Sequence, residues 1–292
     1  MDKLEDIING LLLGDGCITI DKNKYCRLKV TAKDKKLLEW IKSKLERWGL
    51  RCYFTFDRRN ETYSLYTSHE LFIRLRRRLY TKINGKTQKV VPRDLELTPT
   101  TLLFWYIGDG SLVRHPDPNR VPWIVLATNN FRKEDVEFLI QKLKELGLNF
   151  YAVKYRSGFK RGKECGYALL SKTSDATVYN FFKLIGFKPP KEIENCITGR
   201  KGRGSRIHYL KEKWPKGDEW IKIISNIPKL GLLLRFKEFR KKLGLTQKEA
   251  AKLIGVSREA IRDFENGKNN LSVTNLAKLL SSFKFFNLRV FH

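Results

Sequence analysis

The sequence has few of the residues on which several common kinds of site depend. Its five cysteines include no CxxC spacing, and its four histidines are scattered along the chain. An odd number of isolated cysteines argues against a disulfide framework and against a zinc site. The scattered histidines give little support to a histidine-based nuclease or to a nucleophilic triad. Carboxylates and lysines are therefore the candidate functional groups of this chain.

Long apolar runs and acidic residues are also scarce. No stretch approaches the roughly 18 apolar residues of a membrane span, and the first residues do not resemble a signal peptide. We therefore expect a cytoplasmic protein without a membrane partner. Lysine and arginine total 59 against 31 acidic residues, a net charge of +28. Such an excess repels itself unless a polyanion compensates, which predicts nucleic acid as the partner. The single methionine and the many charged residues favour a thermophilic source.

One short pattern occurs twice, 94 positions apart. Ile8–Gly16 reads INGLLLGDG and Leu102–Gly110 reads LLFWYIGDG. Each is an apolar run of about three helical turns that ends in Gly-Asp-Gly, so each sets an acid, Asp15 or Asp109, at a helix end. A helix that is apolar on nearly every face has to be buried on nearly every face. The two helices are therefore predicted to pack side by side and to bring their acids together.

Two adjacent carboxylates repel each other unless cations lie between them. Hard divalent cations such as Mg²⁺ prefer oxygen ligands together with water. A paired acid site of this kind is typical of metal-dependent phosphodiester cleavage. Gly10 and Gly14, four residues apart, provide a flat strip for the close approach of the two helices.

The segments after each Gly-Asp-Gly repeat the same predicted order. Alternating strands and amphipathic helices give α-β-β-α-β-β-α in each half, and KLERWGL at Lys44–Leu50 matches KLKELGL at Lys142–Leu148. In each half we expect four strands in a curved sheet, with one face packed on helices and the other lined by basic and polar side chains. From Gly186 to Pro228 the chain is rich in Gly, Pro and Lys, which predicts a partly ordered connector.

The repeated motif resembles that of the LAGLIDADG homing endonucleases in their single-chain, double-motif form. The resemblance implies an α+β fold of two pseudo-symmetric αββαββα halves that form a β-saddle on DNA. It assigns metal binding to Asp15 and Asp109 and to the carbonyls of Gly14 and Gly108. Phe104 stands where the motif has its first glycine, so we expect the helix pair to pack asymmetrically.

The resemblance also implies residues at the edge of the acid site. The family places a polar residue that positions water after the second strand, and the corresponding positions here are Ala32 and Asn129. Alanine cannot orient water, so the two half-sites are expected to differ. Lys33 would substitute for Ala32 in the first half. Basic residues near the cleft would stabilise charge on the phosphate, and the candidates are Lys86, Lys89, Lys201 and Arg203. These could equally be phosphate contacts of ordinary linkers.

The C-terminal part carries a second pattern. TQKEAAKLIGVSREAIRDFENGK begins with Thr246, an N-cap that forms a capping box with Glu249, and Gly255 follows as a turn. The string resembles the helix-turn-helix of Cro and phage-repressor-like domains, so a recognition helix would begin at Ser257. The segment from Lys229 onward contains 14 basic and 5 acidic residues, an excess of positive charge that suits DNA binding.

The residues expected to contact DNA lie on the outer faces of both sheets and on the helix-turn-helix. They are Lys22, Lys24, Arg27, Lys29, Arg58 and Arg59 in the first half, Arg114, Arg120, Lys154, Arg156, Lys160 and Arg161 in the second, and Gln247, Arg258, Glu259 and Arg262 at the C-terminus. Most would contact phosphates, with the recognition-helix residues directed to base edges.

The expected organisation is two halves at 1–95 and 96–200, a connector at 201–228 and a small all-α helix-turn-helix domain at 229–292. The resemblance implies a monomeric, Mg²⁺-dependent endonuclease of intron or intein mobility. It would make a staggered double-strand cut across the minor groove of a long, pseudo-palindromic target. Two alternatives stay open: a transcription regulator that binds DNA on the same scaffold without cutting it, and an RNA maturase that helps its intron fold.

Overall fold

A computed structural model of the chain describes residues 3–21, 25–83, 85–154, 166–200, 207–225, 236–266 and a few residues beyond. These residues divide into two compact units. Unit 1 comprises Met1–His115, Pro122–Lys172 and Thr177–Trp214, and unit 2 comprises Pro116–Val121, Thr173–Ala176 and Pro215–His292. Within the described part of the chain, none of the helices combines the length and the apolar character that crossing a membrane requires.

The first half of unit 1 follows the expected order. Its elements are α1 (Leu4–Leu13), β1 (Gly16–Ile20), β2 (Cys26–Ala32), α2 (Lys35–Glu46), β3 (Cys52–Asp57), β4 (Thr62–Ser68) and α3 (Leu71–Leu79). The four strands form one antiparallel sheet in the order β1-β2-β4-β3. Leu28, Val30 and Leu65 point to the buried face of this sheet, where α2 contributes Leu38 and Ile41 to the core.

The second half repeats the same order and the same sheet. Its elements are α4 (Pro99–Asp109), β7 (Gly110–Val113), β8 (Trp123–Thr128), α5 (Lys133–Glu145), β9 (Phe150–Lys154), β10 (Tyr167–Ser171) and α6 (Thr177–Ile185). The sheet order is β7-β8-β10-β9, the counterpart of the first sheet. The predicted duplication of one αββαββα unit is therefore confirmed.

Two further hairpins complete unit 1. The first consists of β5 (Tyr80–Ile83) and β6 (Lys86–Lys89), and the second of β11 (Ile197–Arg200) and β12 (Ile207–Tyr209), which runs into the 3-10 turn η1 (Leu210–Lys213). The turn ends at Trp214, a buried side chain whose indole donates to the carbonyl of Gly186. This part of the segment predicted to be a partly ordered connector is ordered, and its apolar residues Leu210 and Trp214 are buried.

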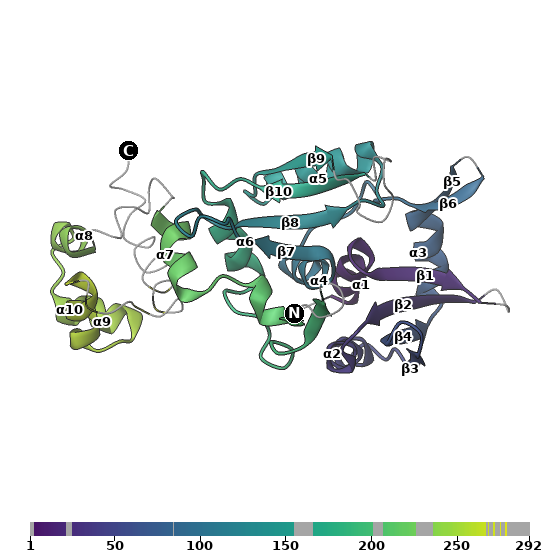
Figure 1. Ribbon diagram of the computed structural model, residues 1–292, viewed down its shortest axis with the longest axis horizontal. Helices are drawn as coiled ribbons and strands as arrows, with labels where there is room; N and C mark the ends of the chain where they lie inside the picture. Colours follow the sequence, from purple (N-terminus) through teal and green to yellow (C-terminus); the bar gives the residue numbers. More distant parts are fainter. Residues whose placement is uncertain are drawn as a thin grey trace. The chain divides into compact units, whose positions relative to one another are not determined.

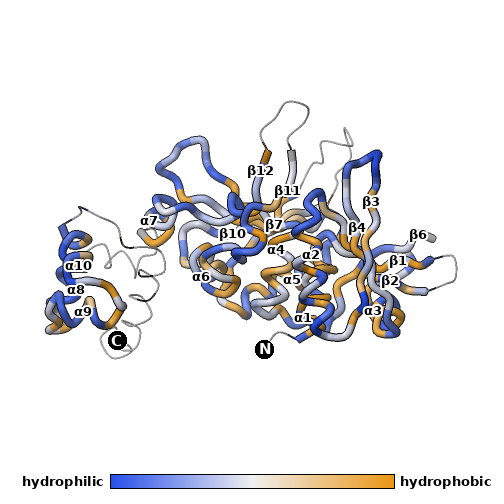
Figure 2. Tube along the Cα trace, turned by 90° about the horizontal axis from the view of Figure 1, so that it is seen from below, coloured by the Kyte–Doolittle hydropathy of each residue, from blue (hydrophilic) through white to orange (hydrophobic). Residues whose placement is uncertain are grey.

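The helices of the repeated motif form the centre of unit 1. In Figure 1, α1 and α4 lie side by side, and they pack against each other along their length. Trp105 and Tyr106 of α4 are completely buried, and α4 lies in a strongly hydrophobic part of the trace in Figure 2. Helix α4 begins at Pro99, after Thr98, whose hydroxyl accepts a hydrogen bond from the amide of Thr101. Burial on every side is what the apolar run predicted.

Unit 2 contains α7 (Gly217–Ser225) and three short helices, α8 (Phe236–Lys242), α9 (Gln247–Ile254) and α10 (Arg258–Glu265). The predicted caps are present: Thr246 and Glu249 form a reciprocal capping box, and Ser257 accepts from the amide of Ala260. Gly255 joins α9 to α10 with φ of +69°, a conformation that favours glycine. Ile254 and Ile261 are buried between the helices. These features confirm the helix-turn-helix.

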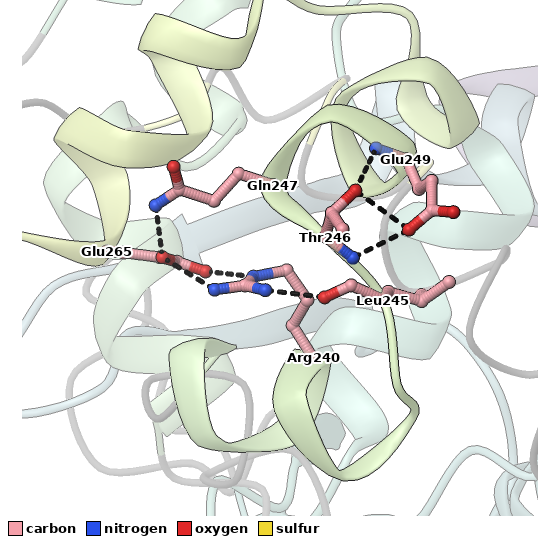
Figure 3. A network of polar contacts seen from close by, with 6 residues as sticks. All are labelled: Arg240, Leu245, Thr246, Gln247, Glu249 and Glu265. Carbon is pink, nitrogen blue, oxygen red and sulfur yellow. Dashed lines mark hydrogen bonds and ion pairs between the residues drawn. The ribbon is translucent and has the colours of Figure 1, made fainter.

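A buried ion pair ties the three short helices together. Figure 3 shows Arg240 of α8 reaching Glu265 of α10, with a distance of 2.5 Å from Nε to Oε1. The same guanidinium donates to the carbonyl of Leu245, and the Gln247 side chain donates to Oε2 of Glu265 at 2.8 Å. One arginine therefore connects α8, the start of α9 and the end of α10.

Candidate active site and nucleic-acid surfaces

Glycines allow α1 and α4 to meet at van der Waals distance. A Cβ added to Gly10 would lie 2.6 Å from Cβ of Phe104 and 2.6 Å from the carbonyl oxygen of Thr101. Nearer the acids, a Cβ on Gly14 would lie 3.5 Å from Cα of Gly108. The bulky Phe104 is accommodated because glycine faces it, and its ring stacks on Trp40 at 5.1 Å. The contact is asymmetric, as the departure from the motif at Phe104 predicted.

The close approach places Asp15 and Asp109 together at the ends of the two helices. The two carboxyl groups are within hydrogen-bonding distance of each other. Desolvation, followed by the charge of Asp15, raises the pKa of Asp109 to about 7. Desolvation also raises the pKa of Asp15, against the opposing charges of Lys213 and Lys89. Such a pair has strong affinity for compensating positive charge.

Two lysines cap the ends of the acid-bearing helices. Lys89 of β6 donates to the carbonyls of Leu12 and Gly16, at 2.7 and 2.8 Å. Lys213 of η1 donates to the carbonyls of Ile107 and Gly108, at 2.7 and 3.1 Å. Both ammonium groups also act electrostatically on the two acids, and a cation at a helix C-terminus interacts favourably with the helix dipole. Desolvation lowers the pKa of Lys213 to about 8.

A pocket of ≈ 590 Å³ opens over the acids on the side of Lys89. Its wall includes Asp15, Asp109, Lys89, Asn129 and Asn130. The Oδ1 atom of Asn129 is buried and, among the described residues, has no hydrogen-bond partner. A buried amide oxygen without a partner is suited to accept a hydrogen bond from a water or ligand in the pocket.

The strand registers correct one predicted correspondence between the halves. Gly16 pairs with Val30, and Gly110 pairs with Leu126. Two positions further on, Ala32 therefore corresponds to Thr128, and Asn129 corresponds to Lys33 rather than to Ala32. The sequence could not decide this because the connection from β8 to α5 is longer than that from β2 to α2. The Thr128 hydroxyl is committed to the carbonyl of Tyr167, at 2.6 Å.

Sequence reasoning missed Lys213. Of the predicted basic residues, Lys89 lies in the acid site, Lys86 lies on β6, and Lys201 and Arg203 fall outside the described residues. Lys213 occurs in an ordinary-looking KEKWPK string, within the segment predicted to be a connector. No local signal distinguishes it from its neighbours, because its role depends on the packing of η1 against α4.

The η1 turn is itself held by side chains of the second half. Arg114 donates to the carbonyls of Glu212 and Trp214, at 2.9 and 3.2 Å, on either side of Lys213. The Tyr106 hydroxyl donates to the carbonyl of Lys213. Arg114, which the sequence predicted to contact DNA, is therefore engaged in holding the segment that carries Lys213.

The outer faces of the two sheets differ from each other, and in the described part of the chain only the first carries expected basic residues in the interior of a strand. On the first sheet, Arg27 and Lys29 lie on the polar face, and Arg27 pairs with Asp21 at 2.5 Å. On the second, strands β8 and β10 present Val125 and Leu170 outward instead of the expected basic residues. Among the residues that the structure describes, the outer face of the second sheet is therefore less basic than predicted, because Arg114 follows β7, Arg120 lies between β7 and β8, and Lys154 is the last residue of β9. Arg58, Arg59, Arg120 and Lys154 are exposed, whereas Lys22, Lys24, Arg156, Lys160 and Arg161 lie outside the described residues.

The predicted DNA-facing residues of the helix-turn-helix occupy two environments. Arg258, Glu259 and Arg262 are exposed on α10. Gln247 is partly buried and bound to Glu265 (Figure 3). The exposed side chains begin at the N-terminal end of α10, the part of a recognition helix that reaches base edges.

These features agree with comparisons to known proteins. Residues 5–162, just over half of the chain, match the LAGLIDADG DNA endonuclease family. The chain belongs to this family. A relative of this chain, the uncharacterized protein MJ1098 of Methanocaldococcus jannaschii, is 33% identical over 200 residues, which cover 65% of this chain and 71% of that protein. Residues 236–285 match the helix-turn-helix family.

One further relative and one solved structure carry endonuclease descriptions. A probable intron-encoded endonuclease 1 of Wickerhamomyces canadensis is 29% identical over 150 residues, which cover 48% of this chain and 63% of that protein. The solved structure of the homing endonuclease I-WcaI bound to its DNA recognition sequence matches this chain with a TM-score of 0.47 and 22% identity. The match covers 62% of this chain and 79% of the I-WcaI chain.

The donor groups at the acid site suit a hard divalent cation. Asp15 and Asp109 offer carboxylate oxygens that repel each other when both are charged, and the pocket beside them has room for water and phosphate oxygens. The carbonyl of Gly108 also lies at this site, although it already accepts a hydrogen bond from Lys213.

Proposed function

We propose that this LAGLIDADG protein is a divalent-metal-dependent DNA endonuclease that makes a staggered double-strand cut across the minor groove. The observation that carries the proposal is the buried pair of Asp15 and Asp109, with one lysine at the end of each acid-bearing helix. Both acids are present, and the charges of Lys89 and Lys213 act on both of them. The endonuclease description of the Wickerhamomyces canadensis relative supports the same activity.

Asp15 and Asp109 would hold Mg²⁺ between the helix ends. When bound, the metal lowers the pKa of water and offsets negative charge on the scissile phosphate. Asn129 would accept a hydrogen bond from the attacking water through Oδ1 and so orient it. Lys89 and Lys213 would stabilise the additional negative charge that develops on the phosphate, because their ammonium groups are already fixed by backbone carbonyls.

The helix-turn-helix would add a second set of DNA contacts outside the cleavage site. We propose that Arg258, Glu259 and Arg262, exposed on α10, read base edges in a major groove. The remaining basic residues would contact phosphates and make affinity salt-dependent.

A cleavage assay on a randomised plasmid library tests the proposal. The purified chain with Mg²⁺ is expected to yield discrete ends with short 3′ overhangs, and EDTA is expected to abolish them. Asp15→Asn and Asp109→Asn are each expected to abolish double-strand cutting and to leave the Kd for the selected site within about threefold, because the amide keeps the shape of the side chain but not its charge. Normal cutting by both variants would refute the assignment of the acids.

The helix-turn-helix makes a non-cleaving regulator the second candidate. A domain that matches residues 236–285 is sufficient in many proteins to select an operator, and it needs no acid pair to do so. Specific binding by the wild-type chain with no cut in Mg²⁺ or Mn²⁺ would favour this candidate over the endonuclease.

A further inference from the structure

The two sheets of unit 1 can be compared position by position through their registers. Each begins at the glycine that follows an acid, Gly16 or Gly110, and each has the same strand order. The pairing of Lys29 with Tyr66 in the first sheet thus corresponds to the pairing of Val125 with Leu170 in the second. Residues that pair directly across strands share a face, so this comparison identifies equivalent side chains.

The outer face of the first sheet carries hydrogen-bonding groups. The ammonium of Lys29 lies over the ring of Tyr66, at 5.7 Å from the ring centre. Arg27, one row further along, is held by Asp21 and donates to the hydroxyl of Tyr53 at 3.0 Å. Donors held at defined positions in this way suit guanine, whose major-groove edge offers two acceptors.

The outer face of the second sheet is apolar at the equivalent positions. Val125 replaces Lys29, Leu170 replaces Tyr66 and Trp123 replaces Arg27. On the edge strand β9, Tyr151 is 46% exposed and Val153 is 39% exposed, and both belong to this face. The opposite face is the one that is buried, with Leu126 and Leu169 at 0% exposure. An apolar face of this kind penalises unpaired polar base edges and favours methyl groups.

Both outer faces are continuous with the acid site. Cys17, in the same row as Lys29, lines the pocket that contains Asp15 and Asp109. Ala127, on the same face as Val125, lines an adjoining pocket of ≈ 80 Å³ beside Asp109. A duplex whose phosphates reach the acids would therefore lie along both faces, and the net charge of +28 supplies the attraction.

Resting on the proposed function, we propose that the target has two chemically different halves. The first sheet reads its half by hydrogen bonds to purine edges through Arg27 and Lys29. The second sheet reads its half by apolar contacts to thymine methyl groups through Val125, Leu170 and Trp123. The target would therefore depart from the pseudo-palindrome that the duplicated fold suggests, because the duplication preserved the backbone and not the outward side chains.

Removal of thymine methyl groups tests this directly. After the full chain selects its site from randomised duplexes, thymine is replaced by deoxyuridine in one half at a time. Substitution in the half read by the second sheet is expected to weaken binding about fourfold for each contacted methyl group. The matched substitution in the other half is expected to change Kd by less than about twofold, because its bases are read through polar edges.

Paired variants assign each sheet to its half. Val125→Lys is expected to shift the preferred base from thymine to guanine at one position of the thymine-rich half only. The reciprocal variant Lys29→Val is expected to relax the preference at the equivalent position of the other half. Leu170→Thr provides a second, milder test on the same face, and an unchanged thermal unfolding midpoint shows that each variant is folded.

Three outcomes would overturn the inference. They are selected sites with equivalent halves, deoxyuridine substitution without effect in either half, and a Val125→Lys variant that changes self-association of the chain instead of base choice. The proposed function fails in a different way, by the absence of any selected or cut sequence. A chain that cuts a symmetric site would therefore refute the two-chemistry target and leave the endonuclease intact.

Discussion

At the scale of single residues, the acid site depends on charges that compensate one another across the pseudo-twofold arrangement. Asp15 and Asp109 lie where desolvation and mutual repulsion oppose ionisation, as the raised pKa of Asp109 indicates. Lys89 donates to the Leu12 carbonyl near the end of α1, and Lys213 donates to the Ile107 carbonyl near the end of α4, where carbonyls have no partner within the helix. Each lysine is therefore both a helix cap and a nearby positive charge for the acids.

Removal of the Lys213 charge tests this double role. Lys213→Met keeps much of the aliphatic side chain but removes the ammonium, so double-strand cleavage is expected to fall about 10²- to 10³-fold. Lys211→Met, at an exposed neighbour that contacts Asn195, is expected to cut at the wild-type rate. Measuring the single-turnover cleavage rate together with the Kd separates chemistry from binding. A variant that binds DNA more weakly but cuts at the wild-type single-turnover rate would contradict a role for Lys213 in catalysis.

At the scale of secondary-structure elements, the α1–α4 contact depends on glycine where the helices cross. Gly10→Ala would place a methyl group 2.6 Å from both Phe104 and Thr101, so the helices would have to move apart. The free energy of unfolding is expected to fall by about 1–3 kcal/mol. Gly199→Ala is a suitable control, because its added methyl group has open space around it. Equal unfolding midpoints of the two variants in urea would contradict the proposed importance of close helix packing.

The helix-turn-helix depends instead on a buried charge. Burial raises the pKa of Glu265, but the hydrogen bonds from Arg240 and Gln247 outweigh it, and the net pKa is lowered. The carboxylate therefore stabilises the folded state above the unfolded pKa of 4.5, and this stability is lost as the pH falls through the lower folded pKa. Arg240→Met leaves Glu265 without its positively charged partner and is expected to destabilise this domain by about 3–5 kcal/mol at neutral pH.

Amide hydrogen exchange of α9 and α10 in the full chain measures both effects. Protection of these helices is expected to fall as the pH is lowered below 4.5, once intrinsic exchange rates are taken into account. At neutral pH, Arg240→Met should lose protection there. Arg262→Met removes an exposed arginine beside Asp263 and should keep it. Unchanged protection in Arg240→Met would show that the ion pair does not hold the three helices together.

At the scale of the whole molecule, the charge excess predicts strongly salt-dependent binding. Each neutralised phosphate adds about −0.9 to the slope of log Kobs against log salt. Neutralising Arg258 and Arg262 together is expected to reduce the magnitude of the slope by at most about 2. The reduction is smaller if either arginine contacts a base instead of a phosphate. Neutralising Glu259 as Glu259→Gln should leave the slope unchanged or increase it. Binding that does not respond to salt would contradict an extended phosphate interface.

Much of this protein could be predicted from its sequence, because the deciding signals are local. The repeated Gly-Asp-Gly places an acid at the end of each apolar helix, and the capping box at Thr246 and Glu249 marks where α9 begins. Periodicity predicts most elements of the two αββαββα halves, since the sheet strands and the outer helices each bury one face, and a continuous apolar run marks α1 and α4. The net charge of +28 limits the partner class without any knowledge of the fold.

Other features were decided only by tertiary structure, because they join segments that are far apart in the chain. Lys213 reaches the acid site through the packing of η1 on α4, across 105 residues to Gly108. The correspondence of Ala32 with Thr128 follows from strand register, which the sequence around these residues does not determine. The contrast between Lys29 and Val125 likewise becomes visible only when the two sheets are aligned by their hydrogen bonds. Local sequence thus determined the elements and their acids, whereas the packing between elements decided which side chains surround them.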